Sequence, residues 1–257
     1  MTDGTPNYAP GTPMWVDHTT PDVQASARFY SQLFGWDAQD MGEQMGHYTI
    51  FRYKGKMVAA TTPPMNPGTP TVWSTYIATA NAEETAKKVS EAGGQVLMAP
   101  FTVMDQGTMG VFQDPSGAVF CVWQPGVHKG AELVNQPVSF SWNELATKDM
   151  NAAKEFYSKV FGWTPKGSPM PDGTEYVEWQ LNGKPIGGGM TMGSNFPPNV
   201  PPHWLVYFTV NNADDSVKRL QELGGNVMVP PTDIPQGRFS VVADPLGAPF
   251  AVIQLAA

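Results

Sequence analysis

An internal repeat that covers nearly the whole chain limits its possible folds more than any other feature. FYSQLFGW at residues 29–36 returns as FYSKVFGW at 156–163, and STYIATANAEETAKKVSEAGGQV at 74–96 returns as LVYFTVNNADDSVKRLQELGGNV at 205–227. The offset between the copies drifts only between 127 and 131 residues, so insertions and deletions are short and fall between elements. A chain of 257 residues can bury two cores of this size. The sequence therefore predicts two similar domains, at 11–126 and 137–257.

Each copy contains the same local pattern twice. In the first copy, Asp22 is placed to cap a helix whose apolar residues recur at helical spacing until Gly35. Asn81 is placed to cap a second helix, which Gly93 ends. Alternating or apolar runs that predict strands lie at 14–19, 47–53, 56–61, 73–79, 95–100, 107–114 and 118–124. The predicted fold class is therefore α+β, with four strand–helix–strand–strand–strand units forming two domains.

Composition excludes several functional classes. The net charge is −8, and the 15 Lys and Arg residues do not cluster, which argues against nucleic-acid binding. No apolar run approaches the roughly 20 residues of a membrane span, and residues 1–13 show no secretory signal pattern. Cys121 is the only cysteine, so no internal disulfide can form. We expect a cytoplasmic protein, monomeric or homodimeric, without membrane or nucleic-acid partners.

Three motifs resemble one known superfamily. They are the helix ending in FY..LFGW, the helix followed by GG.V, and the closing DP.G strand pair, and together they span residues 12–255. They resemble the vicinal oxygen chelate superfamily, which includes glyoxalase I, bleomycin-resistance proteins and extradiol dioxygenases. The tandem layout is similar to actinobacterial glyoxalase-like proteins, a group that includes a mycobacterial culture-filtrate antigen and relatives labelled hydroxylases. The resemblance implies that two units form a cupped sheet around a cleft that holds metal and substrate.

The residues at the family's metal positions predict that no metal is bound. The matching positions hold Trp15, Ser74 and Cys121 in the first copy, and Trp142, Leu205 and Ala251 in the second. The fourth position falls in MVAAT or PIGGGM, which contain no His or carboxylate. A divalent metal needs several converging nitrogen, oxygen or thiolate donors, and Trp, Leu and Ala supply none. We therefore expect no metal and no cofactor. We interpret Trp15, Ser74, Cys121, Trp142 and Leu205 as ligand-binding residues instead.

Two carboxylates are the candidates for catalysis. Asp17 and Glu144 follow Trp15 and Trp142 by two residues, and strand alternation puts residues two apart on one face. A carboxyl group buried beside an indole has a raised pKa and can act as a general acid or base. The alternative is a structural carboxylate bonded to backbone or to a basic side chain.

Two tyrosines and the cysteine complete the candidate clefts. Tyr76 and Tyr207 should face the same clefts, where a phenol can bind a ligand or donate a proton. The alternative is packing with a satisfied hydroxyl. Cys121 is either a cleft residue or an inert core thiol. The first cleft is the more polar, so we expect only one of the two to be competent.

Two main functions remain open. The first is binding of a small aromatic or apolar metabolite, for metabolite binding, resistance or detoxification. The second is a metal-independent hydroxylase-, lyase- or isomerase-like enzyme of natural-product metabolism that uses Asp17 or Glu144. A metal-dependent glyoxalase or dioxygenase is a third hypothesis.

Overall fold

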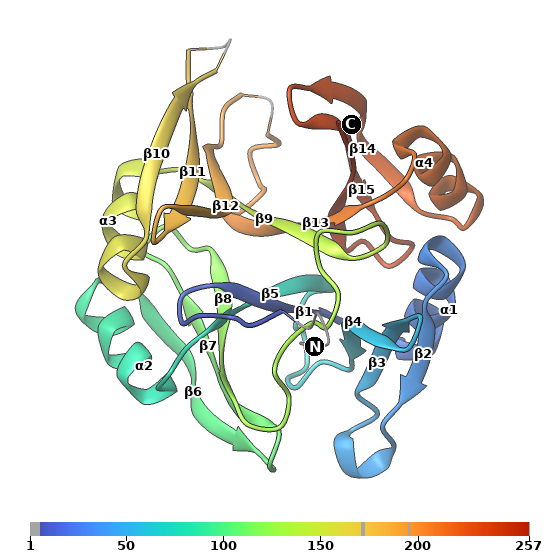
Figure 1. Ribbon diagram of the computed structural model, residues 1–257, viewed down its shortest axis with the longest axis horizontal. Helices are drawn as coiled ribbons and strands as arrows, with labels where there is room; N and C mark the ends of the chain where they lie inside the picture. Colours follow the sequence, from blue (N-terminus) through green and yellow to red (C-terminus); the bar gives the residue numbers. More distant parts are fainter. Residues whose placement is uncertain (1–5, 171–172, 195, 257) are drawn as a thin grey trace, which may run out of the picture.

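The computed structural model describes residues 6–170, 173–194 and 196–256, and it contains two eight-stranded mixed sheets with the same strand order. Sheet A has the order β2-β3-β4-β1-β5-β8-β7-β6 and sheet B has the order β10-β11-β12-β9-β13-β16-β15-β14. The sheets curve in opposite halves of the molecule (Figure 1). The first five residues of the N-terminal stretch and Ala257 lie outside the described residues.

The predicted strand–helix–strand–strand–strand unit is confirmed in all four places. The strands of sheet A are β1 (Pro13–Thr19), β2 (Asp37–Asp40), β3 (Thr49–Tyr53), β4 (Lys56–Thr62), β5 (Val72–Ala78), β6 (Gln95–Val103), β7 (Gly107–Gln113) and β8 (Val119–Pro125). Those of sheet B are β9 (Phe140–Thr147), β10 (Thr164–Pro169), β11 (Glu175–Leu181), β12 (Lys184–Thr191), β13 (His203–Thr209), β14 (Asn226–Ile234), β15 (Gly237–Ala243) and β16 (Pro249–Leu255). The helices are α1 (Val23–Phe34), α2 (Ala82–Glu91), α3 (Met150–Phe161) and α4 (Ala213–Glu222), with a short 3₁₀ turn η1 (Glu43–Met45).

The helix ends follow the capping residues. The side chain of Asp22 accepts a hydrogen bond from the backbone N–H of Ala25 at 2.8 Å, and Asn81 caps α2 in the same way. Gly35 ends α1 with a left-handed backbone, at φ 72°. The short exposed strand β2, which follows α1, was not located from the sequence because it carries no apolar alternation. No helix in the described part of the chain is both long and apolar enough to cross a membrane.

The two domains pack through their helix-bearing faces. α2 lies beside α3 and α1 beside α4, while the helix-free faces of the sheets point away from each other (Figure 1). Two tryptophans make reciprocal contacts across the boundary: Trp36 donates to the carbonyl of Val138 and Trp163 donates to that of Gly11, both at 2.8 Å. The cores of the two domains are therefore continuous, and the domain limits at 126 and 137 stay a prediction.

A buried polar group also joins the domains. His18 lies on the helix side of β1, where Nδ1 is 2.8 Å from the Ser26 hydroxyl and Nε2 is 3.0 Å from Asp244 of the second domain. Strand alternation puts His18 on the face opposite Asp17. This histidine consequently serves domain packing rather than the helix-free face.

Candidate functional site

The helix-free face of each sheet gathers the site residues that the sequence predicts. We call these faces cup one, in sheet A, and cup two, in sheet B. In cup one, β1 and β5 pair so that Trp15 lies opposite Tyr76 and Asp17 opposite Ser74, and Cys121 of β8 lies beside Tyr76. The register of sheet B repeats this arrangement, with Trp142 opposite Tyr207, Glu144 opposite Leu205, and Ala251 beside Tyr207. The predicted residues are thus together in each cup, and their roles remain proposals.

In cup two, one carboxylate is held by two phenols. Tyr207 donates to Oε1 of Glu144 and Tyr176 donates to Oε2, both at 2.9 Å. The indole N–H of Trp142 donates to the Tyr176 hydroxyl at 3.0 Å. We call these four residues the acid clamp of cup two. Because both carboxylate oxygens are bonded, the clamp fixes the position of Glu144.

Cup one contains the matching clamp, in which the hydrogen bond from Tyr48 to Asp17 is longer than the one from Tyr176 to Glu144. Tyr76 donates to Oδ2 of Asp17 at 2.8 Å, while Tyr48 lies 3.4 Å from the same oxygen. Trp15 donates to the Tyr48 hydroxyl at 2.9 Å. Asp17 is one methylene shorter than Glu144, and both of its phenols bond the same carboxylate oxygen.

The sequence reasoning missed Tyr48 and Tyr176. These residues occupy equivalent places in the repeat, as HYTIFRY and EYVEWQL show. Tyr48 directly precedes β3, which pairs with β4, and Tyr176 lies at the start of β11, which pairs with β12. Comparing the two copies position by position would have found the pair. Their aromatic neighbours in the same strands, Phe51 and Trp179, pack into the core instead.

Burial dominates the electrostatics of both acids. Desolvation raises the pKa of Asp17 from 3.8 to about 7, and the hydrogen bonds from Tyr76 and Tyr48 lower it only in part. Desolvation likewise raises the pKa of Glu144, opposed by Tyr207 and Tyr176. No lysine or arginine contributes to either shift. Each cup therefore holds a carboxyl group that can exchange a proton more readily near neutral pH than an exposed one.

The chain that joins the domains covers Trp15 of cup one. We call residues 126–134 the strap. Its Ala131 N–H bonds to the carbonyl of Met14, and Glu132 makes two bonds with the backbone of Met57.

The ring of His128 on the strap stands edge-on to Trp15, with centroids 4.5 Å apart, and Trp123 donates to the carbonyl of His128 at 3.0 Å. Trp15 is consequently only 3% exposed.

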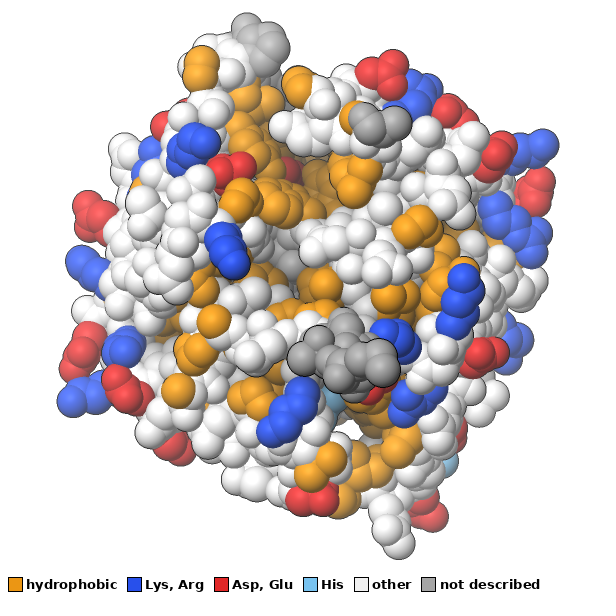
Figure 2. Space-filling view, in the orientation of Figure 1, with side chains coloured by type: hydrophobic (Ala, Val, Ile, Leu, Met, Phe, Trp, Pro, Cys, Tyr) orange, Lys and Arg blue, Asp and Glu red, His pale blue; other side chains and the backbone are white. Residues whose placement is uncertain are grey.

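Cup two keeps an accessible apolar lining. The indole of Trp142 is half-buried, in contrast to Trp15. A small apolar cluster, separate from the main core, surrounds the acid clamp: Leu205, Tyr207, Ala251 and Ile253, with the partly exposed Ile234, Phe239 and Val241. Figure 2 shows the molecule hollowed above β9 and β12, with hydrophobic side chains on the walls. Trp142 is thus more accessible than Trp15, although cup two is the less polar cup, and the expectation that only one cleft is competent stays a prediction.

A glycine makes room for the clamp of cup two. Gly188 of β12 lies beside Glu144, and a Cβ there would overlap the Tyr176 hydroxyl and lie 2.8 Å from the indole nitrogen of Trp142. Its counterpart in cup one by strand register is Ala60. The MVAAT and PIGGGM segments therefore contribute space to the cups and no ligand atoms.

The donors in the cups do not fit the metal that the family resemblance implies. Cup one offers the Asp17 carboxyl group and the thiol of Cys121, whose pKa burial raises so that the thiolate is disfavoured. Cup two offers one carboxylate and two phenols whose pKa burial raises. Within the described residues, no group of three or more His, Cys, Asp or Glu side chains could hold a metal ion. Binding without a metal stays a prediction.

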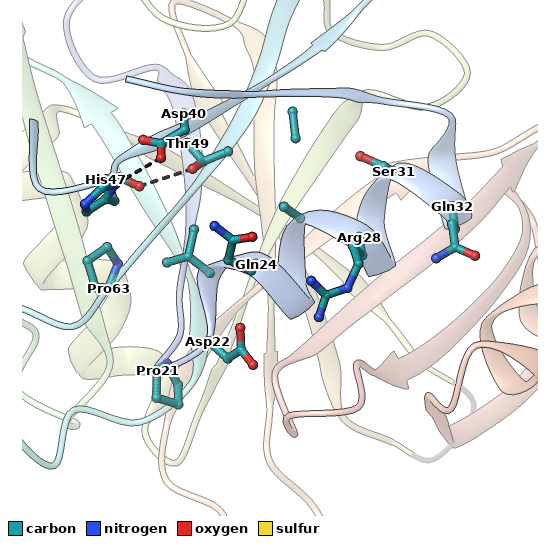
Figure 3. Close-up of a pocket in the computed structure, with 13 residues that line it drawn as sticks. Pro21, Asp22, Gln24, Arg28, Ser31, Gln32, Asp40, His47, Thr49 and Pro63 are labelled. Atoms are coloured by element: carbon teal, nitrogen blue, oxygen red, sulfur yellow. Dashed lines mark hydrogen bonds and ion pairs between the residues drawn. The ribbon is translucent and has the colours of Figure 1, made fainter. Parts of the chain in front are cut away.

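A surface groove lies outside both cups. It measures about 720 Å³ and runs between α1 and the edge strand β2 with its neighbour β3. Figure 3 shows Gln24 and Arg28 on its helix wall and the His47–Asp40 pair, 3.0 Å apart, on the opposite wall. Both members of that pair are exposed, so this groove shows no buried ionisable group among the residues drawn in Figure 3.

Comparisons with known proteins agree with the geometry. The family described as Glyoxalase/Bleomycin resistance protein/Dioxygenase superfamily matches residues 15–122 and 139–252. The chain is 42% identical to the anthracycline biosynthesis protein DauV of Streptomyces sp. (strain C5), covering 96% of this chain and 94% of DauV. It is 40% identical to CFP32 of Mycobacterium tuberculosis (strain CDC 1551 / Oshkosh), covering 96% of both.

Solved structures show the same fold. The 2,3-dioxygenase LapB from Pseudomonas sp. KL28 matches 98% of this chain and 94% of its own, with a TM-score of 0.67 and 12% identity. The Mn(II)-bound glyoxalase from Novosphingobium aromaticivorans matches 96% of this chain and 84% of its own, with a TM-score of 0.64 and 16% identity. At such identities the likeness concerns the fold alone. The two sequence matches and the repeated fold together show that the chain belongs to the glyoxalase/bleomycin resistance protein/dioxygenase superfamily.

Proposed function

We propose that this protein binds a small molecule of natural-product metabolism in cup two. The relatives DauV and DnrV, at 42% and 41% identity, are named for anthracycline biosynthesis and support that metabolic setting. The observation that carries the proposal is the difference between the cups. The strap closes cup one over Trp15, whereas Trp142 of cup two is half-buried at the edge of an apolar cluster. Pockets of this type, apolar with a few convergent polar groups, are typical ligand sites.

A neutral hydrophobic dye tests the proposal. Nile red should bind the protein with one site per chain and respond with increased fluorescence. Leu205→Arg places a charged side chain opposite Glu144 in cup two and should weaken dye binding about tenfold or more. Ser74→Arg is the matched variant in cup one, opposite Asp17, and should leave the affinity within about threefold. Equal loss in both variants, or no dye binding to the native protein, would refute the proposal.

The raised pKa of Glu144 favours a second candidate, a metal-independent enzyme that moves protons in cup two. Glu144 would act as general acid or base, as in lyase- or isomerase-like reactions, and Tyr207 would orient it through the bond at 2.9 Å. Glu144→Gln should then lower turnover about 100-fold while ligand affinity changes little. A binding protein would instead lose affinity and have no turnover to lose. Calorimetry and a product assay on the same variant separate the two candidates.

A further inference from the structure

Cup one contains an internal occupant that indicates what cup two can hold. The imidazole of His128 stands edge-on to Trp15, at an angle of 83° and a centroid distance of 4.5 Å, and also faces Trp123 at 5.5 Å. Burial lowers the pKa of His128 to about 4, so the occupant is a neutral aromatic ring at physiological pH. Edge-to-face contacts at this distance are favourable between aromatic rings.

The corresponding place in cup two is free within the described residues. Trp142 takes the position of Trp15 in the register and makes the same indole bond to a tyrosine, yet no aromatic ring of the described chain stacks on it. Its half-buried indole borders the apolar cluster of cup two. An aromatic ring supplied by a ligand can therefore contact Trp142 as His128 contacts Trp15.

The acid clamp specifies the polar group of that ligand. Both oxygens of Glu144 accept a phenolic hydrogen bond, and each carboxylate oxygen has a further lone pair that can accept another. No lysine or arginine contributes to the pKa shift of Glu144, so an anionic ligand would find no positive partner there and would repel the ionised form of Glu144. A hydroxyl group on the ligand would gain a charge-assisted hydrogen bond.

We infer that cup two binds a neutral, planar aromatic molecule that carries a hydroxyl group, with its ring against Trp142 and its hydroxyl donating to Glu144. This inference rests on the proposed function and names the class of ligand for the same cup. The ring contributes buried apolar area, and the hydroxyl contributes orientation. A molecule lacking the hydroxyl would enter the cup but leave the remaining acceptor positions of Glu144 without a partner.

Three matched probes test the ligand class by calorimetry at neutral pH. They are 2-naphthol, which is neutral and donates a hydrogen bond, 2-methoxynaphthalene, which has the same ring without the donor, and 2-naphthoate, which is anionic. The naphthol should bind about tenfold or more tightly than the methyl ether, the usual scale for a hydrogen bond to a charged group. The naphthoate should bind more weakly than both.

Variants connect this discrimination to the clamp. Glu144→Gln keeps the shape of the side chain but removes the charge, so the advantage of the naphthol over the ether should shrink to about threefold or less. Glu91→Gln removes an exposed carboxylate on α2 and should leave the advantage unchanged. The signal of the Trp142 indole N–H in nuclear magnetic resonance, assigned with Trp142→Phe, should shift when the naphthol binds.

The outcomes separate the ligand class from the proposed function. Equal binding of the naphthol and its ether, or tighter binding of the naphthoate, would overturn the hydroxyl-bearing ligand while small-molecule binding in cup two stands. Binding that survives Leu205→Arg but disappears in Ser74→Arg would place the ligand in cup one and overturn both. Failure of all three probes and of Nile red to bind would overturn the proposed function together with the inference.

Discussion

Tyr30 of the first domain donates a hydrogen bond to Asp244 of the second at 3.0 Å, and Tyr157 of the second domain donates to Asp114 of the first at 3.1 Å. Each phenol also accepts a bond from an indole N–H at 2.9 Å, from Trp73 and Trp204 respectively. The aspartates belong to the DP.G turns that end each repeat. The motif that marks the superfamily therefore also joins the two domains in this chain.

Removing one phenol hydroxyl should loosen the domain boundary. Tyr30→Phe deletes a buried bond to Asp244 and leaves the Trp73 N–H without its acceptor, so we expect a loss of about 1–3 kcal/mol in unfolding free energy. Tyr157→Phe should cost a similar amount. Tyr53→Phe, which lies outside both networks, should stay within about 0.5 kcal/mol. Urea unfolding measures the stability of all three variants. Equal stability of every variant would show that the tyrosine–aspartate hydrogen bonds do not stabilise the domain boundary.

The stability of the protein should fall as the pH rises through the titration of Asp17. The pKa of Asp17 is raised by burial from 3.8 to about 7, so the protonated form is favoured on folding. Its contribution is complete below the unfolded pKa and is lost as the pH rises through about 7, on the order of 4 kcal/mol in total. Asp17→Asn should remove this slope. Parallel stability curves for the native protein and the variant between these pH values would show that folding does not raise the pKa of Asp17.

Truncating His128 should open cup one. His128→Gly removes the ring that covers Trp15 and leaves a cavity beside an indole, with a cost of about 1–3 kcal/mol. Added imidazole should restore part of that stability by refilling the cavity. Without imidazole, Nile red should bind two sites per chain instead of one. His203→Ala lies outside the strap and should show neither effect. A single dye site in His128→Gly would mean that the rest of the strap closes the cup by itself.

A methyl group at Gly188 should disturb the clamp of cup two. In Gly188→Ala the new Cβ would overlap the Tyr176 hydroxyl, so Tyr176 must move away from Glu144. We expect 2-naphthol to bind about tenfold more weakly, with a fold that remains intact by circular dichroism. Gly193→Ala, where a Cβ would meet no atom within 4 Å, should bind as the native protein does. Unchanged affinity in Gly188→Ala would separate the ligand site from Tyr176.

The purified protein should carry no stoichiometric Zn, Ni, Fe or Mn. Neither cup presents the converging donors that these ions require, since the family positions hold Trp15, Ser74 and Cys121 or their partners Trp142, Leu205 and Ala251. Elemental analysis after extensive dialysis is the measurement. One metal ion per domain, lost in Cys121→Ala, would contradict this expectation.

The sequence by itself determined the architecture, because the helix-capping residues and strand patterns are local features and occur in both copies of the repeat. The capping residues Asp22 and Asn81, the glycine stop at Gly35 and the repeated strand patterns specify the four units without reference to distant contacts. Strand alternation also placed Trp15 with Asp17 and Trp142 with Glu144 on single faces.

Only the tertiary structure decided how those faces are completed and which one is accessible. Tyr48 and Tyr176 reach the carboxylates from 31 and 32 residues away in the sequence, and no local pattern encodes such a contact. The polarity of Asp17, Ser74 and Cys121 describes the lining of cup one but carries no information about what covers it. The cover is His128 on the strap, which hydrogen bonds to the backbone of Met14 and Met57 hold in place. These contacts join residues far apart in the sequence, so no local pattern reveals them.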